Sequence, residues 1–323
     1  MATPREPALL ALDWGTSSLR AYLLGGPDEV VASRNAPWGI MHLPEGGYVA
    51  ALESLCGDWL QAHPALPILA SGMVGSAQGW REAPYVHTPA SAEALAQGLA
   101  WVEGPGGRRI GIVPGVMQDG MVPNVMRGEE VQVVGAWPRA AEHAGAGRSV
   151  VMVLPGTHSK WALVREGRIE SFTTCMTGEV FAVLRTHSIL GRLMQPSETM
   201  DVESFERGLS QAQEDGSGLL SSLFSVRTLG LTQRLQPQQL GDYLSGLLIG
   251  HELRESTRAF AAHLDPATPL ILIGAEDLCR RYRLALSHIG LQANTDGYRD
   301  ATPAGLWEVA RMAGLVTTPE GQQ

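Results

Sequence analysis

Short apolar runs separated by glycine-containing turns open the chain. Leu9–Asp13 and Leu19–Leu24 predict two buried strands on either side of a turn, and Glu29–Arg34 predicts a third strand after a second turn. Gly47–Ala62 then carries apolar residues at helical spacing. The opening pattern is therefore strand, turn, strand, hairpin, strand and helix.

The same order returns near residue 150. Ser149–Leu154 predicts a strand, Lys160–Arg165 and Arg168–Thr173 predict the hairpin that follows, and Gly178–Leu190 predicts a helix. The first turn of each copy contains a Gly-Thr pair, at residues 15–16 and 156–157. The repetition lies in the order of the elements rather than in residue identity. It predicts a duplicated α/β unit with a cleft between the copies.

The rest of the chain adds further strands and helices. Thr302 predicts the N-cap of a closing helix, with Pro303 at its first helical position. Strands are expected at Pro67–Ser71, Arg109–Val113 and Pro269–Ile273, and helices at Ser91–Val102, Gln236–Arg258, Glu276–Ser287 and Thr302–Leu315.

Length, charge and cysteine content limit the class of protein. The 323 residues suffice for two domains, and the net charge is −9. This charge repels nucleic-acid phosphates and no basic stripe offsets it, so we expect no nucleic-acid partner. Three scattered cysteines predict no disulfide framework. No apolar stretch approaches the ~20 residues of a membrane span, and the N-terminus lacks a signal-peptide pattern, so we expect a cytoplasmic protein.

Asp13 ends the first predicted strand and is followed at once by small residues. Burying a carboxylate in a core is costly, so its place at a strand end favours a site. The backbone N–H groups of Gly15, Thr16 and Ser17 can face phosphate oxygens, and Asp13 suits a Mg²⁺ ion held through water. The alternative is an aspartate that caps a turn.

The matching turn of the second copy predicts a second phosphate clamp. Lys160 ends it and is the one lysine of the chain; the alternative is an ordinary hairpin with an exposed lysine. His158 suits a hydrogen-bonding role better than that of a base, because no carboxylate can be assigned to orient it. The residues expected to bind phosphate here are Gly156, Thr157, His158, Ser159 and Lys160.

Carboxylates also precede a helical pattern near residue 130. Asp119, Glu129 and Glu130 are candidates for the base that accepts a proton from an attacking hydroxyl in phosphoryl transfer. The alternative is a favourable placement of charge at a helix start.

The predicted strand at Pro269–Ile273 runs into a glycine. Gly274, Ala275 and Glu276 would let a planar ring such as adenine approach the backbone, although a tight strand-to-helix turn has the same pattern. The chain has no GxxxxGK[ST] motif, which excludes a P-loop enzyme.

Together these segments resemble the sugar-kinase, actin and Hsp70 superfamily. More closely, the chain resembles the 2-dehydro-3-deoxygalactonokinase family. The stretches that carry this resemblance are spread over most of the chain: 11–22 (ALDWGTSSLRAY), 71–80 (SGMVGSAQGW), 125–132 (VMRGEEVQ), 156–161 (GTHSKW), 177–181 (TGEVF) and 242–250 (DYLSGLLIG).

The resemblance implies a fold and a reaction. The fold is α/β, with two ribonuclease-H-like (actin-like ATPase) domains around an ATP cleft. Residues 1–113 plus 303–323 would form an N-terminal domain with the sugar-acid pocket, and residues 114–302 a C-terminal nucleotide-binding domain. The reaction is transfer of the ATP γ-phosphate to the 6-hydroxyl of 2-dehydro-3-deoxy-D-galactonate, with Mg²⁺. The resemblance is also compatible with a homodimer.

The resemblance also implies residues that bind the sugar acid. Arg20 or Arg127 would hold its carboxylate, although Arg20 also suits a surface strand, and Trp80 suits a core as well as a pocket. Where the family is expected to carry an aspartate before Val125, this chain has Asn124, so the base is assigned to Glu129 or Glu130. The second phosphate loop also lacks a carboxylate that many sugar kinases carry there. The full expected substrate set is Ser18, Arg20, Gly72, Met73, Gly75, Gln78, Trp80, Tyr85 and Arg127.

Three alternatives share the expected fold. One is a kinase for another sugar or deoxy-keto acid, and another is a nucleotide-binding switch without transfer activity. The third is a phosphatase in which water replaces the sugar.

Overall fold

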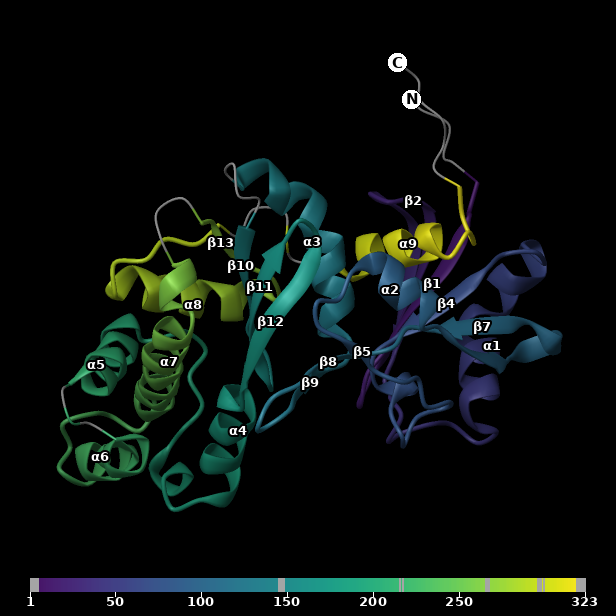
Figure 1. Cartoon of the computed structure of the whole chain (residues 1–323). Helices are drawn as coiled ribbons and strands as arrows, with labels where there is room; N and C mark the ends of the chain where they lie inside the picture. Colours follow the sequence, from purple (N-terminus) through teal and green to yellow (C-terminus); the bar gives the residue numbers. More distant parts are fainter. Residues whose placement is uncertain are drawn as a thin grey trace, which may run out of the picture. The chain divides into compact units, whose positions relative to one another are not determined.

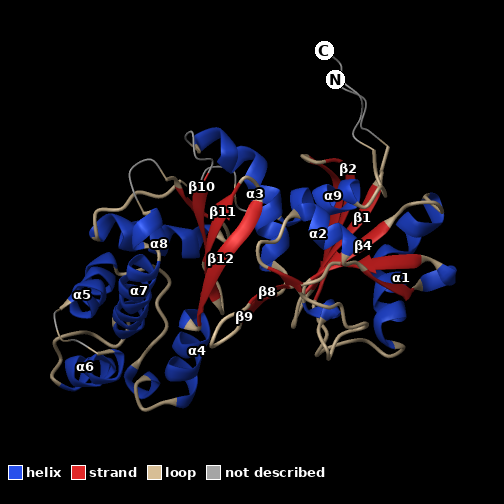
Figure 2. Ribbon diagram, viewed as in Figure 1, coloured by secondary structure: helices blue, strands red, loops and turns tan. Residues whose placement is uncertain are grey.

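The computed structural model describes residues 6–144, 149–214, 216, 218–264, 268–294, 298 and 300–317 (Figures 1 and 2). The chain divides into two compact units. Unit 1 takes in residues up to His143, Val164–Phe172 and residues from Asp300 onward, and unit 2 takes in Ala144–Leu163 and Thr173–Arg299.

The main sheet of unit 1 has six strands in the order β3-β2-β1-β4-β7-β6. β1, β2 and β3 form an antiparallel meander, β1, β4 and β7 are parallel, and β6 pairs antiparallel with β7. Parallel strands bring the ends of β1 and β4 to one edge, which is where the candidate site lies. The strands are β1 (Leu9–Trp14), β2 (Leu19–Gly26), β3 (Glu29–Ala36), β4 (Ile68–Ser71), β6 (Ala100–Glu103) and β7 (Arg109–Ile112).

Helices cover both faces of this sheet. Leu10 and Leu12 of β1 share one buried cluster with Leu52 of α1 (Gly47–Ala62). Leu9 and Ala11 alternate to the opposite face and are also fully buried, and α9 (Thr302–Met312) packs there against β1, β2 and β4. A strand buried on both faces needs a continuous apolar run, which explains why β1 does not alternate.

Two glycines let α9 lie directly against α3 (Glu129–His143). A Cβ atom on Gly135 would lie 2.0 Å from the carbonyl oxygen of Ala301, and one on Gly305 would lie 1.9 Å from that of Val131. Glycine weakens a helix interior, so its presence at both positions indicates that close packing outweighs that cost. Unit 1 also contains α2 (Ala92–Gln97) and a small sheet of β5 (Val86–His87), β8 (Val116–Gln118) and β9 (Asn124–Met126).

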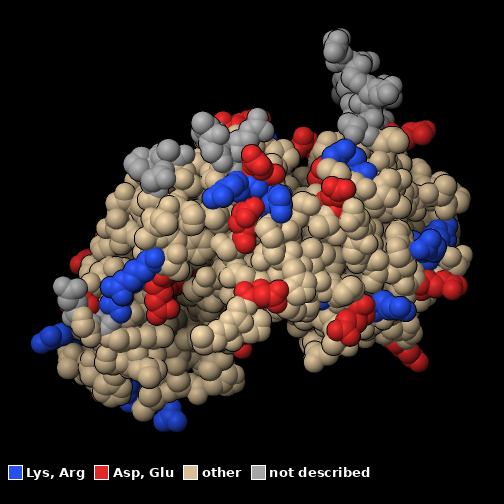
Figure 3. Space-filling view, in the orientation of Figure 1, with Lys and Arg blue, Asp and Glu red and all other residues tan. Residues whose placement is uncertain are grey.

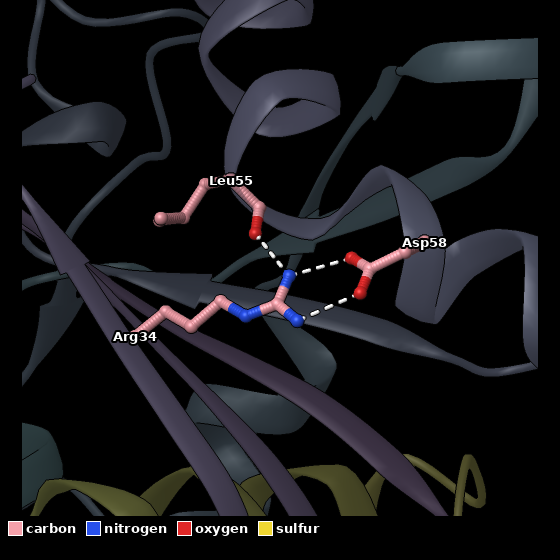
Figure 4. Close-up of polar contacts among 3 residues, drawn as sticks. All are labelled: Arg34, Leu55 and Asp58. Atoms are coloured by element: carbon pink, nitrogen blue, oxygen red, sulfur yellow. Dashed lines mark hydrogen bonds and ion pairs between the residues drawn. The ribbon is translucent and has the colours of Figure 1, made fainter.

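An arginine joins β3 to α1 at the surface of unit 1. Arg34 donates two hydrogen bonds to the carboxylate of Asp58, at 2.5 and 2.7 Å, and a third to the carbonyl oxygen of Leu55 (Figure 4). Its guanidinium also lies 4.1 Å from the ring centroid of Trp59. On the face drawn in Figure 3, basic side chains are scattered among acidic ones.

A four-stranded sheet has the order β12-β11-β10-β13, in which β10 and β13 are parallel. β10, β13 and most of β11 belong to unit 2, whereas the first five residues of β12 are grouped with unit 1. α7 packs closely against α5, because a Cβ atom on Gly246 would lie 2.0 Å from the carbonyl oxygen of Phe205. The elements are β10 (Ser149–Leu154), β11 (Ser159–Arg165), β12 (Arg168–Cys175), β13 (Leu270–Leu272), α4 (Thr177–His187), α5 (Val202–Gln213), α6 (Leu219–Leu231), α7 (Leu240–Ala259) and α8 (Glu276–His288), with short 3₁₀ turns at Met73–Gly75 and Pro105–Gly107 in unit 1 and at Gly191–Leu193 and Ala261–His263 in unit 2.

The structure confirms the repeated order of elements, as β1-β2-β3-α1 and β10-β11-β12-α4. The helix expected at Ser91–Val102 is present but shorter, since α2 ends at Gln97 and Ala100–Glu103 is strand β6. Gly98 ends the helix, and the next residues pair with β7 instead. Thr302 is the first helical residue rather than the N-cap, which is Ala301.

The expected domain boundary at residues 113 and 114 stays a prediction. The compact units divide the chain elsewhere, since residues 114–143 group with unit 1. Among the described residues, no helix is both long enough and apolar enough to cross a membrane.

Candidate active site

Asp13 lies where β1 leaves the sheet of unit 1. It is aligned with Arg20 on β2 and with Ser71 on β4, and its side chain is 28% exposed. Arg20 approaches it to 3.9 Å through Nη1 and is itself 57% exposed. Burial raises the pKa of the Asp13 carboxyl and the Arg20 guanidinium opposes this rise. The carboxylates of Asp300 and Glu129 also raise the pKa of Asp13, so three acidic groups share this edge of unit 1.

The turn after Asp13 is held by a neighbouring loop. The N–H of Gly15 donates to the carbonyl oxygen of Ser18 at 2.9 Å, while Ile40 and Met41 donate to the carbonyl oxygens of Gly15 and Thr16. Thr16 and Ser17 are exposed. The N–H of Gly15 is therefore occupied within the turn and does not face outward as expected, because it closes the turn onto Ser18, whereas Thr16 and Ser17 are exposed.

Two glycines bring separate loops against Asp13. Gly72 has a φ of +91°, and a Cβ atom there would lie 2.9 Å from the carbonyl oxygen of Trp14 and 3.6 Å from Oδ1 of Asp13. Gly128 has a φ of +106°, and a Cβ atom there would lie 3.4 Å from Cα of Gly72. This left-handed conformation favours glycine, so the sequence of both loops follows from their close approach.

Glu129 and Glu130 begin α3 but have different environments. Glu130 is fully buried, and both of its carboxylate oxygens accept a hydrogen bond from the N–H of Gly128, at 2.9 and 2.7 Å. Burial, reinforced by the charge of Glu129, raises the pKa of Glu130 to about 8. Glu129 is partly exposed and accepts a hydrogen bond from the N–H of Arg127 at 3.1 Å. Only Glu129 of this pair is therefore accessible to a substrate.

Because the pKa of Glu130 is raised, we expect the free energy of unfolding to fall as the pH rises. Its folded-state pKa of about 8 exceeds its ordinary value of 4.5, so between these values the folded chain keeps a proton that the unfolded chain releases. Its stabilising contribution is complete below about pH 4.5 and is lost as the pH rises through 8. Urea unfolding of Glu130→Gln should show a pH slope flatter than that of the wild type, by on the order of a few kcal/mol over this range. Equal slopes would contradict a neutral buried Glu130.

The other residues expected to bind substrate divide into accessible and packed ones. Arg127 donates to the carbonyl oxygen of Ala83 at 2.8 Å and lies 4.6 Å from the ring centroid of Tyr85. Its Nε and Nη1 atoms are buried without a partner among the described residues. Arg127 thus fixes the loop that carries Tyr85, and Arg20 is the more accessible of the two expected carboxylate ligands.

Trp80 packs as part of an aromatic group. Its ring stacks on Tyr48 with a centroid distance of 5.2 Å and meets Trp14 edge-on at 5.9 Å. The group borders the main core of unit 1, which favours the core interpretation of Trp80. The carbonyl oxygen of Gln78 accepts a hydrogen bond from the Tyr48 hydroxyl at 3.5 Å, and Met73 and Gly75 form a 3₁₀ turn between Gly72 and these residues.

Asp119 lies on a different part of unit 1. Its Oδ2 atom pairs with Nδ1 of His87 at 2.6 Å, and both side chains are mostly exposed. Asn124 begins β9 of the same small sheet. Of the three candidate bases, only Glu129 is both accessible and close enough to Asp13 to affect its pKa.

In unit 2, the second Gly-Thr turn packs against the start of α4. The N–H of Glu179 donates to the carbonyl oxygen of Thr157 at 2.9 Å, and the Glu179 carboxylate pairs with Nε2 of His158. A Cβ atom on Gly178 would lie 2.4 Å from the carbonyl oxygen of Gly156. A helix N-terminus beside a glycine turn is a favourable place for phosphate.

Lys160 supports this turn from within. It is 2% exposed, and its ammonium group donates to the carbonyl oxygen of His158 at 2.8 Å. The alternative of an exposed hairpin lysine is therefore wrong. Ser159 is also buried, and its hydroxyl lies 2.8 Å from that of Tyr282.

A cavity of about 600 Å³ opens beside the turn, entirely within unit 2. Ala275 lines it, whereas Gly274 turns the chain with a φ of +143° and Glu276 starts α8. The residues that line the cavity include Gly156, Thr157, Thr177, Gly178, Gly241, Asp242, Ser245, Ala275, Arg281 and Tyr282.

The sequence interpretation missed several of these lining residues. Arg281 pairs with Asp242 at 2.7 Å inside the cavity wall. The small residues of α7 are a sequence signal that could have located the cavity, because Gly241 and Ser245 line it one helical turn apart.

Comparisons with known proteins identify the family. The sequence model of the 2-keto-3-deoxy-galactonokinase family matches residues 13–309 of this chain. The chain is 37% identical over 305 residues to the probable 2-dehydro-3-deoxygalactonokinase of Rhizobium meliloti (strain 1021), covering 93% of this chain and 96% of the relative. This chain belongs to the 2-keto-3-deoxy-galactonokinase family. It is also 34% identical over 302 residues to 2-dehydro-3-deoxygalactonokinase of Escherichia coli (strain K12), covering 93% of this chain and 97% of that enzyme.

Solved structures agree with membership of this kinase family. A crystal structure of a family protein from Sinorhizobium meliloti has a TM-score of 0.82 and 36% identity, covering 94% of this chain and 98% of that chain. The activator of 2-hydroxyisocaproyl-CoA dehydratase from Clostridium difficile, solved with ADPNP, has a TM-score of 0.51 and 13% identity over 95% of each chain. The second match shows the fold alone. The predicted family and the actin-like ATPase fold are thus confirmed.

The described residues fit the ligands that a kinase of this family implies. The cavity of about 600 Å³ lies in the usual range for small-molecule sites and has a glycine turn and a helix start in its wall. Asp13 is a partly exposed carboxylate of the kind that holds Mg²⁺ together with substrate phosphates and water.

Proposed function

We propose that this chain transfers the γ-phosphoryl group of ATP to the 6-hydroxyl of 2-dehydro-3-deoxy-D-galactonate, giving the 6-phosphate and ADP. The observation that carries the proposal is the family match over residues 13–309, which includes Asp13 and both Gly-Thr turns. We further propose a cytoplasmic location and a homodimer for this enzyme.

ATP binding is assigned to unit 2. The turn of Gly156, Thr157, His158 and Ser159 would surround the phosphates, together with the N–H groups at the start of α4. Lys160 would act by holding this turn through the carbonyl oxygen of His158, 2.8 Å away. The adenosine end would lie along Gly274, Ala275 and Glu276, of which Ala275 lines the cavity.

Substrate binding and proton transfer are assigned to unit 1. Arg20 would hold the substrate carboxylate, because its side chain is 57% exposed while the polar atoms of Arg127 are packed inside. Ser18, Gly72 and Gln78 would offer polar contacts beside it. Tyr85, Trp80, Met73, Gly75 and Arg127 would shape the pocket wall from behind.

Glu129, rather than the buried Glu130, is assigned as the base that accepts the proton of the 6-hydroxyl. Asp13 would hold Mg²⁺, and the exposed Thr16 and Ser17 of the turn that begins at Gly15 would meet the transferred phosphate. The metal ion would neutralise charge that develops on the phosphate oxygens. Water can attack the γ-phosphate in place of the sugar hydroxyl. We therefore also propose that closure over the bound substrates excludes water.

The test is ADP release from ATP and Mg²⁺ with and without candidate acceptors. We expect stimulation by 2-dehydro-3-deoxy-D-galactonate of at least about a hundredfold over hydrolysis without an acceptor, and much less by its gluconate epimer or by plain hexoses. Stimulation by another sugar acid alone would support the alternative of a same-fold kinase with a different acceptor. Slow hydrolysis that no sugar acid stimulates would support a nucleotide-binding switch or a phosphatase instead.

A further inference from the structure

Unit 2 contains a buried carboxylate next to the nucleotide cavity. Glu252 of α7 is 4% exposed. Its Oε1 atom accepts a hydrogen bond from Nε1 of Trp161 at 2.9 Å, and its Oε2 atom accepts one from the Tyr282 hydroxyl at 2.6 Å. The Thr177 hydroxyl donates to the same Oε2 atom. Three donors from three other elements thus meet on one side chain.

Two of the three donors line the cavity, and the third follows the Gly-Thr turn that lines it. Thr177 begins α4 and Tyr282 lies on α8, and both residues line the cavity. Trp161 lies on β11, two residues after Ser159 at the end of the Gly-Thr turn. Glu252 therefore connects the turn, the start of α4 and α8.

The hydrogen bonds have a single direction while Glu252 is ionised. A carboxylate only accepts, so the Tyr282 hydroxyl donates its hydrogen bond to Glu252, and the Ser159 hydroxyl, 2.8 Å from that of Tyr282, then donates to Tyr282. The Thr177 hydroxyl donates a hydrogen bond to Glu252 as well. These hydrogen bonds hold the hydroxyl groups of Ser159 and of Thr177, the first residue of α4, in a single orientation.

The cost of this arrangement indicates a purpose other than stability. Burial raises the pKa of Glu252, while the hydrogen bonds from Thr177, Tyr282 and Trp161 oppose the rise. A buried carboxylate is expensive to desolvate, and apolar residues of similar volume would stabilise a core at least as well. The start of α4 is also bonded to the Gly-Thr turn, because the N–H of Glu179 donates to the carbonyl oxygen of Thr157.

We propose that Glu252 is a positioning residue for the nucleotide. Acting through Thr177 and through Tyr282 with Ser159, it fixes the start of α4 and the end of the second phosphate turn in the arrangement that binds the ATP phosphates. This inference rests on the proposed function, because it concerns the same nucleotide site. Glu252 itself would touch neither ATP nor the sugar acid.

The test is Glu252→Gln, which preserves volume and one acceptor oxygen. With that oxygen facing Trp161, the new amide N–H group faces Thr177 and Tyr282, so both hydroxyls must reverse. The matched control is Glu255→Gln, on the exposed side of the same helix. The non-hydrolysable analogue ADPNP with Mg²⁺, titrated by calorimetry without sugar acid, measures nucleotide affinity directly.

We expect Glu252→Gln to weaken ADPNP binding and raise the KM for ATP by roughly tenfold or more, with the KM for the sugar acid unchanged. Glu255→Gln should match the wild type in ADPNP affinity, in the KM for ATP and in the KM for the sugar acid. A wild-type ADPNP affinity in Glu252→Gln, or an equal rise in both KM values, would overturn the inference. If Glu252→Gln does not fold, Tyr282→Phe removes the hydroxyl that joins Glu252 to Ser159 and leaves the contact with Thr177, and unchanged ADPNP binding there would equally overturn the inference.

Failure of the proposed function has a different result. A wild-type chain that binds ADPNP but phosphorylates no sugar acid would refute the reaction, whereas the affinity comparison between Glu252→Gln and Glu255→Gln would still decide the role of Glu252.

Discussion

Replacing Asp13 by asparagine should reduce kcat by roughly a thousandfold while the chain stays folded. The substitution keeps the shape of the side chain and removes the charge that would hold Mg²⁺ at the end of β1. Because burial raises the pKa of Asp13, the folded chain disfavours its ionised form, and a neutral asparagine should leave the thermal midpoint equal or higher. The measurements are ADP release with the sugar acid and thermal unfolding of both proteins.

Asp58→Asn is the matched control for Asp13→Asn. Asp58 is also a carboxylate of unit 1, but its side chain is 65% exposed and it pairs with Arg34 on the surface of α1 (Figure 4). Loss of this exposed pair should change stability little and leave kcat unchanged. If Asp13→Asn retains normal turnover, the assignment of the metal to Asp13 is refuted.

The regular elements were predictable because their signals are local. An apolar run without alternation predicted β1, and turn residues at fixed offsets predicted the hairpins of both copies. The helix expected at Ser91–Val102 was too long for the opposite reason. Its last residues pair with β7 as strand β6. In so short a segment, the spacing of apolar residues does not distinguish a strand from the end of a helix, because the pairing depends on a partner elsewhere in the chain.

The site was predictable to a smaller extent. Both Gly-Thr turns could be located, since a glycine followed by small hydroxyl residues between two strands is typical of a phosphate-binding turn. The sequence could not separate Glu129 from Glu130, because adjacent helix residues point about 100° apart and only packing decides which is buried. Glu252 went unnoticed as well, since its partner Trp161 lies 91 residues away.

The small residues of α7 have two roles that the sequence alone does not separate. Gly246 lets α7 contact α5, whereas Gly241 and Ser245 line the nucleotide cavity. The small residues of α7 thus serve helix packing on one side and border a cavity on another. Sequence alone cannot divide these roles, because both require only the absence of a large side chain.

Glu129→Gln should lower kcat by roughly a hundredfold to ten-thousandfold, the usual contribution of a general base. The KM for ATP should change little, because the proposed nucleotide site lies in unit 2. Glutamine preserves the acceptor for the N–H of Arg127 and removes the capacity to take a proton.

The adjacent Glu130→Gln is the matched control, since Glu130 is fully buried and its oxygens are occupied by the N–H of Gly128. Its kcat should stay within about threefold of the wild type, because a buried group cannot receive the substrate proton. Steady-state kinetics of both variants at saturating ATP decides the matter. A severe loss in Glu130→Gln with near-normal turnover in Glu129→Gln would exclude Glu129 as the base.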